Sequence, residues 1–117
     1  MTKLESLKKN SHFEIVLKNR VVNNDLFSIY RAKNFIKKKG SNKKLYISFV
    51  MRKKVGNAVK RNRIKRRLKS IVQKLLKINS AINSNYTYII FGKTKVYEEK
   101  NEELFAKMKK SFKGMRN

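Results

Sequence analysis

The stretch KKVGNAVKRNRIKRRLK, from Lys53 to Lys69, decides the fold expected for this chain. Residues three and four positions apart share one face of an α-helix, and apolar residues recur at that spacing from here onward. The apolar face consists of Ile64, Leu68, Ile71, Val72 and Leu75. Before it, Gly56 relaxes the chain and the Asn57 side chain can cap free amide groups. The pattern predicts a helix over about residues 57–79, with its apolar face in a core.

The opposite face of this helix carries amide, ammonium and guanidinium groups. Charged helix faces usually mix both signs, because acidic and basic neighbours stabilise a helix. No acidic residue occurs in this stretch, so its charges repel one another until a polyanion neutralises them. An anionic lipid surface is the alternative, but the apolar face is needed for the core, which favours nucleic acid. The outer face comprises Asn62, Arg63, Arg66, Lys69, Ser70 and Gln73.

The composition supports a polyanionic partner for the whole chain. The 117 residues are long enough for one domain, residues 1–117, and 40% of them are hydrophobic. Lys and Arg number 32 against 7 Asp and Glu, which gives a formal net charge of +25. No carboxylate occurs between Asp25 and Glu98, so the basic character covers the middle of the fold. These features predict RNA or DNA as a constitutive partner.

The sequence lacks the residues of a protein active site. Cysteine is absent, which excludes disulfides and thiolate-bound zinc and fits a cytoplasmic location. His12 is the only histidine, and the central strands offer no carboxylate pair for catalytic metals. No apolar run is long enough for a membrane span, and the N-terminus lacks a signal peptide. We therefore expect no catalytic residue, no metal ligand and no membrane contact.

The remaining periodicities predict a short series of elements. Residues 1–10 are expected to form a basic, flexible arm. A capping box of Ser11 and Glu14 predicts a helix to about Lys18. The later glutamates, from Glu98 on, precede lysines in a final helix, which matches the helix dipole. Strands are expected at 20–24, 26–35, 45–52 and 86–91, and the final helix at 98–113.

This order predicts a single small α+β sandwich, αβββαβα. The basic segment 37–42 (KKKGSN) is turn-rich and suits a hairpin between the second and third of these strands. The apolar residues are too few for two cores, so the helices are expected to cover one sheet face together.

The run from Lys53 to Arg66, with its Gly-Asn-Ala-Val entry and Arg-Asn-Arg core, closely resembles the signature of the bacterial ribonuclease P protein component. Segments 7–17, 27–30 and 88–91 resemble that family's first helix, long strand and last strand. The resemblance implies the αβββαβα order. It also implies a left-handed βαβ crossover, as in ribosomal-protein-like folds, where general handedness rules predict the opposite hand.

The resemblance further implies a function. In this family a catalytic RNA uses Mg2+ to remove the 5′ leader of precursor tRNA, and the protein supports that RNA. The implied partners are the ribonuclease P RNA and precursor tRNA, with no obligate protein partner and no cofactor on the protein alone. The RNA-binding positions carried over are Lys53, Lys54, Asn57, Arg61, Asn62, Arg63, Lys65, Arg66 and Lys69.

A second implied surface is a leader-binding cleft between the first helix and the sheet. Its candidate residues are Phe13, Leu17, Phe27 and Tyr30, although the first three also fit a purely structural role in the core. Leu17 stands where the family commonly has an aromatic residue, which weakens stacking there. At the end of the third predicted strand, Arg52 would add a phosphate contact.

Two other interpretations stay open at this stage. A basic ribosomal protein or RNA chaperone with a structural role has the same composition, and only the signature favours ribonuclease P over it. A DNA-architectural protein is less well supported, because no dimerising heptad or minor-groove arm is evident.

Overall fold

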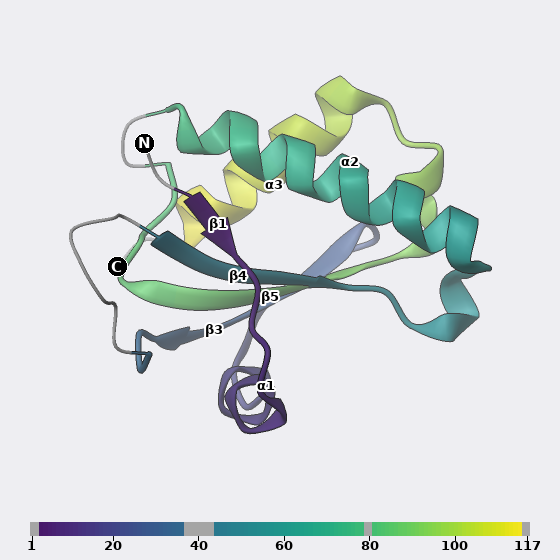
Figure 1. The fold of residues 1–117 in the computed structure, drawn as a ribbon. Helices are drawn as coiled ribbons and strands as arrows, with labels where there is room; N and C mark the ends of the chain where they lie inside the picture. Colours follow the sequence, from purple (N-terminus) through teal and green to yellow (C-terminus); the bar gives the residue numbers. More distant parts are fainter. Residues whose placement is uncertain (1–2, 37–43, 79–80, 116–117) are drawn as a thin grey trace.

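The computed structural model describes residues 3–36, 44–78 and 81–115, and its architecture is a five-stranded mixed sheet with helices on both faces (Figure 1). The elements in chain order are β1 (Lys3–Glu5), α1 (Asn10–Leu17), β2 (Arg20–Asn23), β3 (Phe27–Lys33), β4 (Lys44–Val50), η1 (Lys53–Val55), α2 (Ala58–Leu76), β5 (Tyr86–Gly92), η2 (Thr94–Tyr97) and α3 (Asn101–Gly114). The strand order in the sheet is β1-β4-β5-β3-β2. The 3-10 turn η1 lies between β4 and α2, and the 3-10 turn η2 lies between β5 and α3.

Strand β5 is the centre of the sheet. It pairs antiparallel with β3 and parallel with β4. Its residues from Thr87 to Ile90 are all buried, so both of its faces are covered. Because β5 lies between β3 and β4, the predicted hairpin between those two strands is wrong. The basic segment 37–42 assigned to that hairpin lies outside the described residues.

The connection from β4 through α2 to β5 is a left-handed crossover. The chain runs along β4, returns above the sheet in α2, and runs again in the same direction in β5, which lies behind β4 in this view (Figure 1). This hand is opposite to that of nearly all parallel βαβ units. The expectation taken from the family resemblance is confirmed.

The larger core lies between the sheet and the pair α2 and α3. The predicted apolar face of α2 is buried, with every one of its residues at most 2% exposed. From α3, Leu104, Met108 and Phe112 join the same cluster. The side chain of Asn57 accepts a hydrogen bond from the Lys60 amide at 2.9 Å, so the predicted cap of α2 is confirmed.

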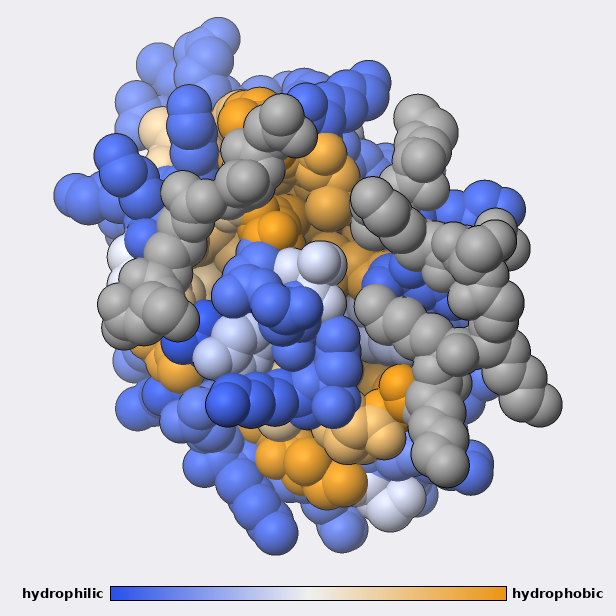
Figure 2. Space-filling view, turned by 90° about the vertical axis from the view of Figure 1, so that its left-hand side faces the viewer, coloured by the Kyte–Doolittle hydropathy of each residue, from blue (hydrophilic) through white to orange (hydrophobic). Residues whose placement is uncertain are grey.

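A second, smaller core lies on the opposite face of the sheet, beneath α1. Leu7, Val16 and Ile89 are its buried centre, with Phe13 and Tyr30 among the partly buried residues around them. Figure 2 shows hydrophobic residues in two areas, above and below a band of hydrophilic ones. The prediction that all helices cover one face is wrong, because alternate residues of β5 supply apolar side chains to both faces.

The N-terminal segment is built into the sheet. Residues Lys3–Glu5 form β1, which pairs parallel with β4, so the flexible arm predicted for residues 1–10 is corrected over this part. The Leu7 amide donates to the Ser48 hydroxyl at 2.9 Å in a buried position. Helix α1 then begins at Asn10, with Lys9 as N-cap and no side-chain cap. The predicted capping box at Ser11 is therefore wrong, because docking of the preceding segment sets the helix start.

The final helix also starts later than predicted. Glu98 and Glu99 lie between η2 and α3, while Glu102 and Glu103 occupy the first turn of α3. Only the latter two therefore complement the helix dipole. No helix among the described residues has the length and apolarity needed to cross a membrane.

Candidate nucleic-acid interface

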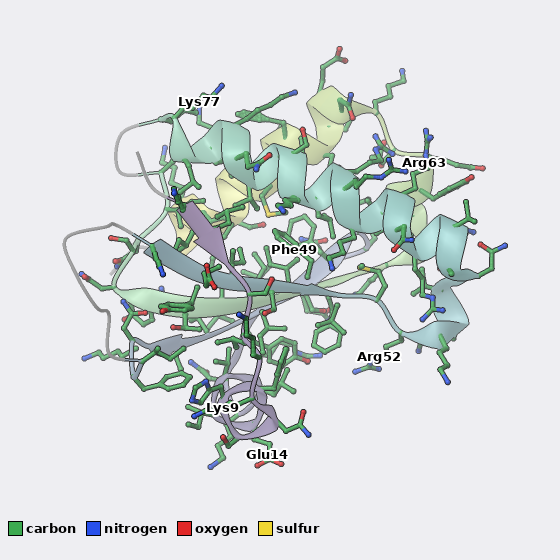
Figure 3. The ribbon with its side chains drawn as sticks, in the orientation of Figure 1. Lys9, Glu14, Phe49, Arg52, Arg63 and Lys77 are labelled. Carbon is green, nitrogen blue, oxygen red and sulfur yellow. The ribbon has the colours of Figure 1, made fainter. Side chains whose placement is uncertain are left out.

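The face of α2 that points away from the core carries the predicted RNA-binding residues. Lys53 and Lys54 lie in η1, and Asn57 caps the helix. Arg63 projects from α2 on the side opposite to the sheet (Figure 3). The structure thus brings the signature positions onto one continuous basic surface, called here the basic face. Its exposed members are Lys53, Lys54, Asn57, Asn62, Arg63, Lys65, Arg66 and Lys69.

Gly56 makes the turn that joins the two parts of the basic face. Its φ of 155° lies in the region that favours glycine. A side chain at this position would also meet the Lys60 chain at 2.6 Å. Glycine therefore lets η1 run directly into α2, so that Lys53 and Lys54 lie beside the first turn of the helix.

Arg61 differs from the other signature residues because it is half-buried. Within the described residues its Nε atom is buried and has no hydrogen-bond partner. A buried donor without a partner costs about 1–3 kcal/mol. Arg61 is therefore less accessible to a ligand than the exposed members of the basic face.

Arg67 belongs to the same basic run, but its part-buried guanidinium is bonded to the η2–α3 connection. It donates to the carbonyl oxygens of Val96, Tyr97 and Glu99 and to Oδ1 of Asn101. Burial, and then the charge of the neighbouring Arg63, lower the pKa of Arg67. Arg67 is therefore a structural link between α2 and the η2–α3 connection, a role that its place in a charge run did not indicate.

Tyr97 of η2 contacts two cations of α2. The Lys60 Nζ lies 5.0 Å from the centroid of the Tyr97 ring, and the Arg63 Cζ lies 5.3 Å from it. Both distances are within the range of cation–π attraction. Beside this cluster, α2 and the η2–α3 connection border a groove of about 910 Å³, whose lining includes Arg63, Arg66, Arg67, Ser70, Lys74 and Tyr97.

A second surface lies on the α1 side of the sheet, and we call it the aromatic cleft. Tyr30 of β3 and Phe91 of β5 meet edge to face, with ring centroids 5.4 Å apart. The Arg52 guanidinium lies 5.2 Å from the Phe91 centroid. The cleft has a volume of about 420 Å³, and its lining also includes Lys54 of the basic face. Arg52 and Arg63 lie at the same end of the molecule, on opposite sides of the sheet (Figure 3).

The structure separates the four predicted cleft residues. Tyr30 lines the aromatic cleft. Phe13 is partly buried in the small core that adjoins it, and Leu17 is 37% exposed on α1. Phe27 is fully buried in the other core, under α2 and α3, so its assignment to the cleft is wrong. Side chains alternate between the two faces of a strand, so Phe27, three residues before Tyr30, faces the opposite side of the sheet.

Several cleft residues were not predicted as such. Phe91 was assigned only to a buried strand, and Arg20 only to a short strand. Lys93 donates to the Asn23 side chain at 2.7 Å and lines the same cleft. The register that pairs Ser28 with Phe91 brings these residues together, and no local sequence pattern reveals that register. Arg52, expected to add a phosphate contact, does line the cleft.

The arrangement of side chains on these two surfaces suits binding of a ligand. In the described part of the chain, no three His, Cys, Asp or Glu side chains gather where they could hold a metal ion. His12 packs edge to face on Phe35, at 5.1 Å between centroids. Asp25 pairs with Lys95 at 2.6 Å and with Lys107 at 3.5 Å. Cations and aromatic rings, arranged on two surfaces, define a small α+β protein suited to a polyanionic partner with unpaired bases.

Comparison with known proteins gives the family. The model of the family described as Ribonuclease P matches residues 1–116. The ribonuclease P protein component of Mesomycoplasma hyopneumoniae is 30% identical over 118 residues, which cover 99% of this chain and 96% of that protein. That of Macrococcus caseolyticus is 41% identical over 70 residues, 59% of this chain and 56% of the relative. The chain belongs to the ribonuclease P protein component family.

Solved structures of the same family share the fold. The ribonuclease P protein of Thermotoga maritima superposes with a TM-score of 0.74 at 18% identity and covers 97% of this chain and 99% of its own. That of Staphylococcus aureus gives 0.64 at 23% identity, over 95% and 94% of the two chains. Family membership makes the chain a ribonuclease P subunit that serves tRNA processing, and it implies association with the RNA of that enzyme.

Proposed function

We propose that this protein assists a catalytic RNA in removing the 5′ leader of precursor tRNA, and that it binds that RNA and the leader on two different surfaces. The observation that carries the proposal is the position of the aromatic cleft relative to the basic face. Lys54 belongs to both surfaces, and Arg52 and Arg63 lie at the same end of the molecule. One RNA–substrate junction at this end can therefore contact both.

The basic face binds the phosphates of the catalytic RNA. Guanidinium groups bind phosphate oxygens through paired donors, and asparagine can bond a base edge or a sugar hydroxyl. Among the ion pairs of the described residues none involves a member of the basic face, so its exposed charges are available to neutralise phosphate, although Glu98 and Glu99 line the adjoining groove. Part of the binding free energy then comes from released counterions.

The aromatic cleft holds the single-stranded leader. Unpaired bases stack on aromatic rings whatever their sequence, with about 1–3 kcal/mol for each base. Tyr30 and Phe91 supply the rings, while Arg20, Arg52 and Lys93 supply cations for the leader backbone. Such a site suits a substrate set with varied leaders, since stacking does not depend on the identity of the base.

The catalytic groups and the Mg2+ ions of the holoenzyme belong to the RNA in this proposal. The described residues provide no metal-ligand set, and the protein contributes screening of phosphate repulsion, so that less Mg2+ is needed. The protein acts in the cytoplasm with RNA partners and without an obligate protein partner.

The experiment is cleavage of precursor tRNA by the cognate catalytic RNA at low Mg2+, with and without the protein. We expect strong stimulation that Arg61→Ala and Arg63→Ala reduce. Lys109→Ala is the matched control, because this exposed lysine lies on α3, away from both surfaces. Absence of stimulation, combined with binding to any RNA tested, would instead support a ribosomal or chaperone role.

A further inference from the structure

Tyr97 lies where it can orient two cations of the basic face. Its ring is in cation–π contact with Lys60 and Arg63, which are three residues apart on α2. Residues at this spacing lie on the same side of a helix. Arg63 is exposed, so without such a contact its long side chain would sample many rotamers in the free protein.

The segment that carries Tyr97 is held from two sides. Arg67 of α2 bonds the carbonyl oxygens of Val96, Tyr97 and Glu99. On the other side, Lys95 forms an ion pair of 2.6 Å with Asp25 in the β2–β3 connection. The Lys93 amide also donates to the Leu26 carbonyl at 2.9 Å. The backbone of η2 is therefore tied both to the basic helix and to the sheet.

The planar guanidinium of Arg67 is suited to holding η2 against α2. A guanidinium presents several donors in a fixed fork, whereas a lysine ammonium is a single point charge. The fork spans three carbonyl oxygens and the Asn101 side chain, at 3.1 Å to the Tyr97 oxygen and 2.9 Å to Asn101. A lysine at position 67 could reach only part of this set.

We propose that Arg67 and Tyr97 are positioning residues for RNA binding: Arg67 holds η2 against α2, and the Tyr97 ring then orients Arg63 and Lys60 toward the RNA. This inference rests on the proposed function of the basic face. Pre-orientation raises affinity because fewer rotamers are lost when the RNA binds. Arg66 lies on the same face, but no cation–π contact among the described residues involves it. Its contribution to RNA affinity should therefore not depend on Tyr97.

The test is a double-mutant cycle on affinity for the catalytic RNA. Arg63→Ala and Arg66→Ala are each measured in the natural protein and in the Tyr97→Leu variant. We expect Tyr97→Leu to weaken binding about two- to fivefold. The cost of Arg63→Ala in affinity should shrink in that background by up to the same factor, because part of the loss falls on Lys60. The cost of Arg66→Ala should be equal in both backgrounds. Tyr97→Phe keeps the ring and should restore the full cost of Arg63→Ala.

A spectroscopic measurement keeps the inference testable without RNA. The Arg63 side-chain NMR resonances should carry a ring-current shift that Tyr97→Leu removes and Tyr97→Phe retains. Arg67→Lys should reduce that shift as well, because the lysine cannot hold η2 in place. Urea unfolding of each variant identifies those that lose the fold, and the NMR comparison then uses the folded ones.

The outcomes separate this inference from the proposed function. Equal, measurable costs of Arg63→Ala in both backgrounds would overturn the positioning role alone, whereas no effect of Arg63→Ala on RNA affinity would also contradict the phosphate contact proposed for Arg63. Failure of the natural protein to stimulate precursor-tRNA cleavage would overturn the proposed function, whatever the NMR shift. Three results together support both the positioning role and the proposed function: Tyr97→Leu changes the cost of Arg63→Ala, it leaves the cost of Arg66→Ala unchanged, and Tyr97→Phe restores the full cost of Arg63→Ala.

Discussion

Phe27 and Tyr30 lie three residues apart on β3, but their side chains are on opposite faces of the sheet. Phe27 is fully buried beneath α2 and α3, whereas Tyr30 borders the aromatic cleft and contacts Phe91. Alternation along a strand imposes this separation. One short strand thus supplies a core residue to one side and a binding residue to the other, and substitutions at the two positions should have different effects.

At the aromatic cleft, Tyr30→Ala and Phe91→Ala should each reduce the preference for precursor over mature tRNA. Loss of a stacked base costs about 1–3 kcal/mol in affinity for the leader-bearing substrate. Affinity for mature tRNA should hardly change, because it has no leader. Binding of both RNAs to the reconstituted holoenzyme measures the preference.

The control for the cleft is Phe27→Leu, which should lower the free energy of unfolding and leave the substrate preference intact in the folded holoenzyme. If Tyr30→Ala and Phe91→Ala both left the preference unchanged, the leader would lie elsewhere.

On the basic face, Arg63→Ala should reduce the salt dependence of RNA affinity. The slope of log affinity against log salt should fall by about one unit, as expected for one lost phosphate contact. Affinities measured over a series of salt concentrations give the slope. Lys109→Ala on α3 provides the reference for removal of one distant charge, and an Arg63→Ala slope equal to that of the natural protein would exclude the contact.

In the larger core, Gly92→Ala should destabilise the fold. A Cβ atom at Gly92 would lie 2.8 Å from Cγ2 of Ile64 and 2.9 Å from Cδ1 of Leu68, both buried side chains of α2. Such overpacking typically costs about 1–3 kcal/mol. Urea unfolding measures the change. Gly114→Ala is the matched control, because in the described part of the chain nothing outside its own helix backbone and its two neighbours lies within 4 Å of a Cβ there. Equal stabilities of the two variants would contradict the prediction.

Tyr88 should make the stability fall at alkaline pH. Burial raises the pKa of Tyr88 from 10.0 to about 12, and its hydroxyl donates to the Asn83 carbonyl at 2.7 Å. Between these two values the unfolded chain loses the proton and the native protein keeps it. The free energy of unfolding therefore decreases with rising pH across this window, by about 1–3 kcal/mol.

Two measurements check the behaviour of Tyr88. Absorbance of tyrosinate in the native protein should show one late phase that Tyr88→Phe removes. Urea unfolding at both ends of the pH window should show a smaller decrease for Tyr88→Phe than for the natural protein. A titration without a late phase would place Tyr88 in a more hydrated environment than the structure does.

Most local features of the fold followed from the sequence, but the capping box at Ser11 and the start of α3 did not. The apolar face of α2, the cap at Asn57 and the buried strand β5 all have the predicted positions, because each depends on short-range spacing and capping chemistry. The predicted hairpin between β3 and β4 did not hold, because the sheet order results from long-range pairing of β5 with both of them. The handedness of the crossover came only from the family resemblance.

For the candidate site, the sequence located the basic face more completely than the aromatic cleft. Helical spacing grouped Asn62, Arg63, Arg66 and Lys69, whereas Lys53, Lys54, Asn57 and Lys65 were added only by the family resemblance. The cleft joins Tyr30, Phe91 and Arg52 from three strands or strand ends, and their proximity depends on strand register. Arg66 and Arg67 are neighbours with the same charge. Only the packing of η2 against α2 shows that Arg67 bonds the protein while Arg66 is exposed.

Strand β1 has a consequence for how the protein behaves in solution. By pairing with Lys44, Leu45 and Tyr46 it occupies the first part of the hydrogen-bonding edge that β4 would otherwise offer to another molecule. β1 itself is three residues long and carries Lys3 and Glu5, and short charged edge strands resist further pairing. The N-terminal segment thus protects the chain from aggregation through strand addition.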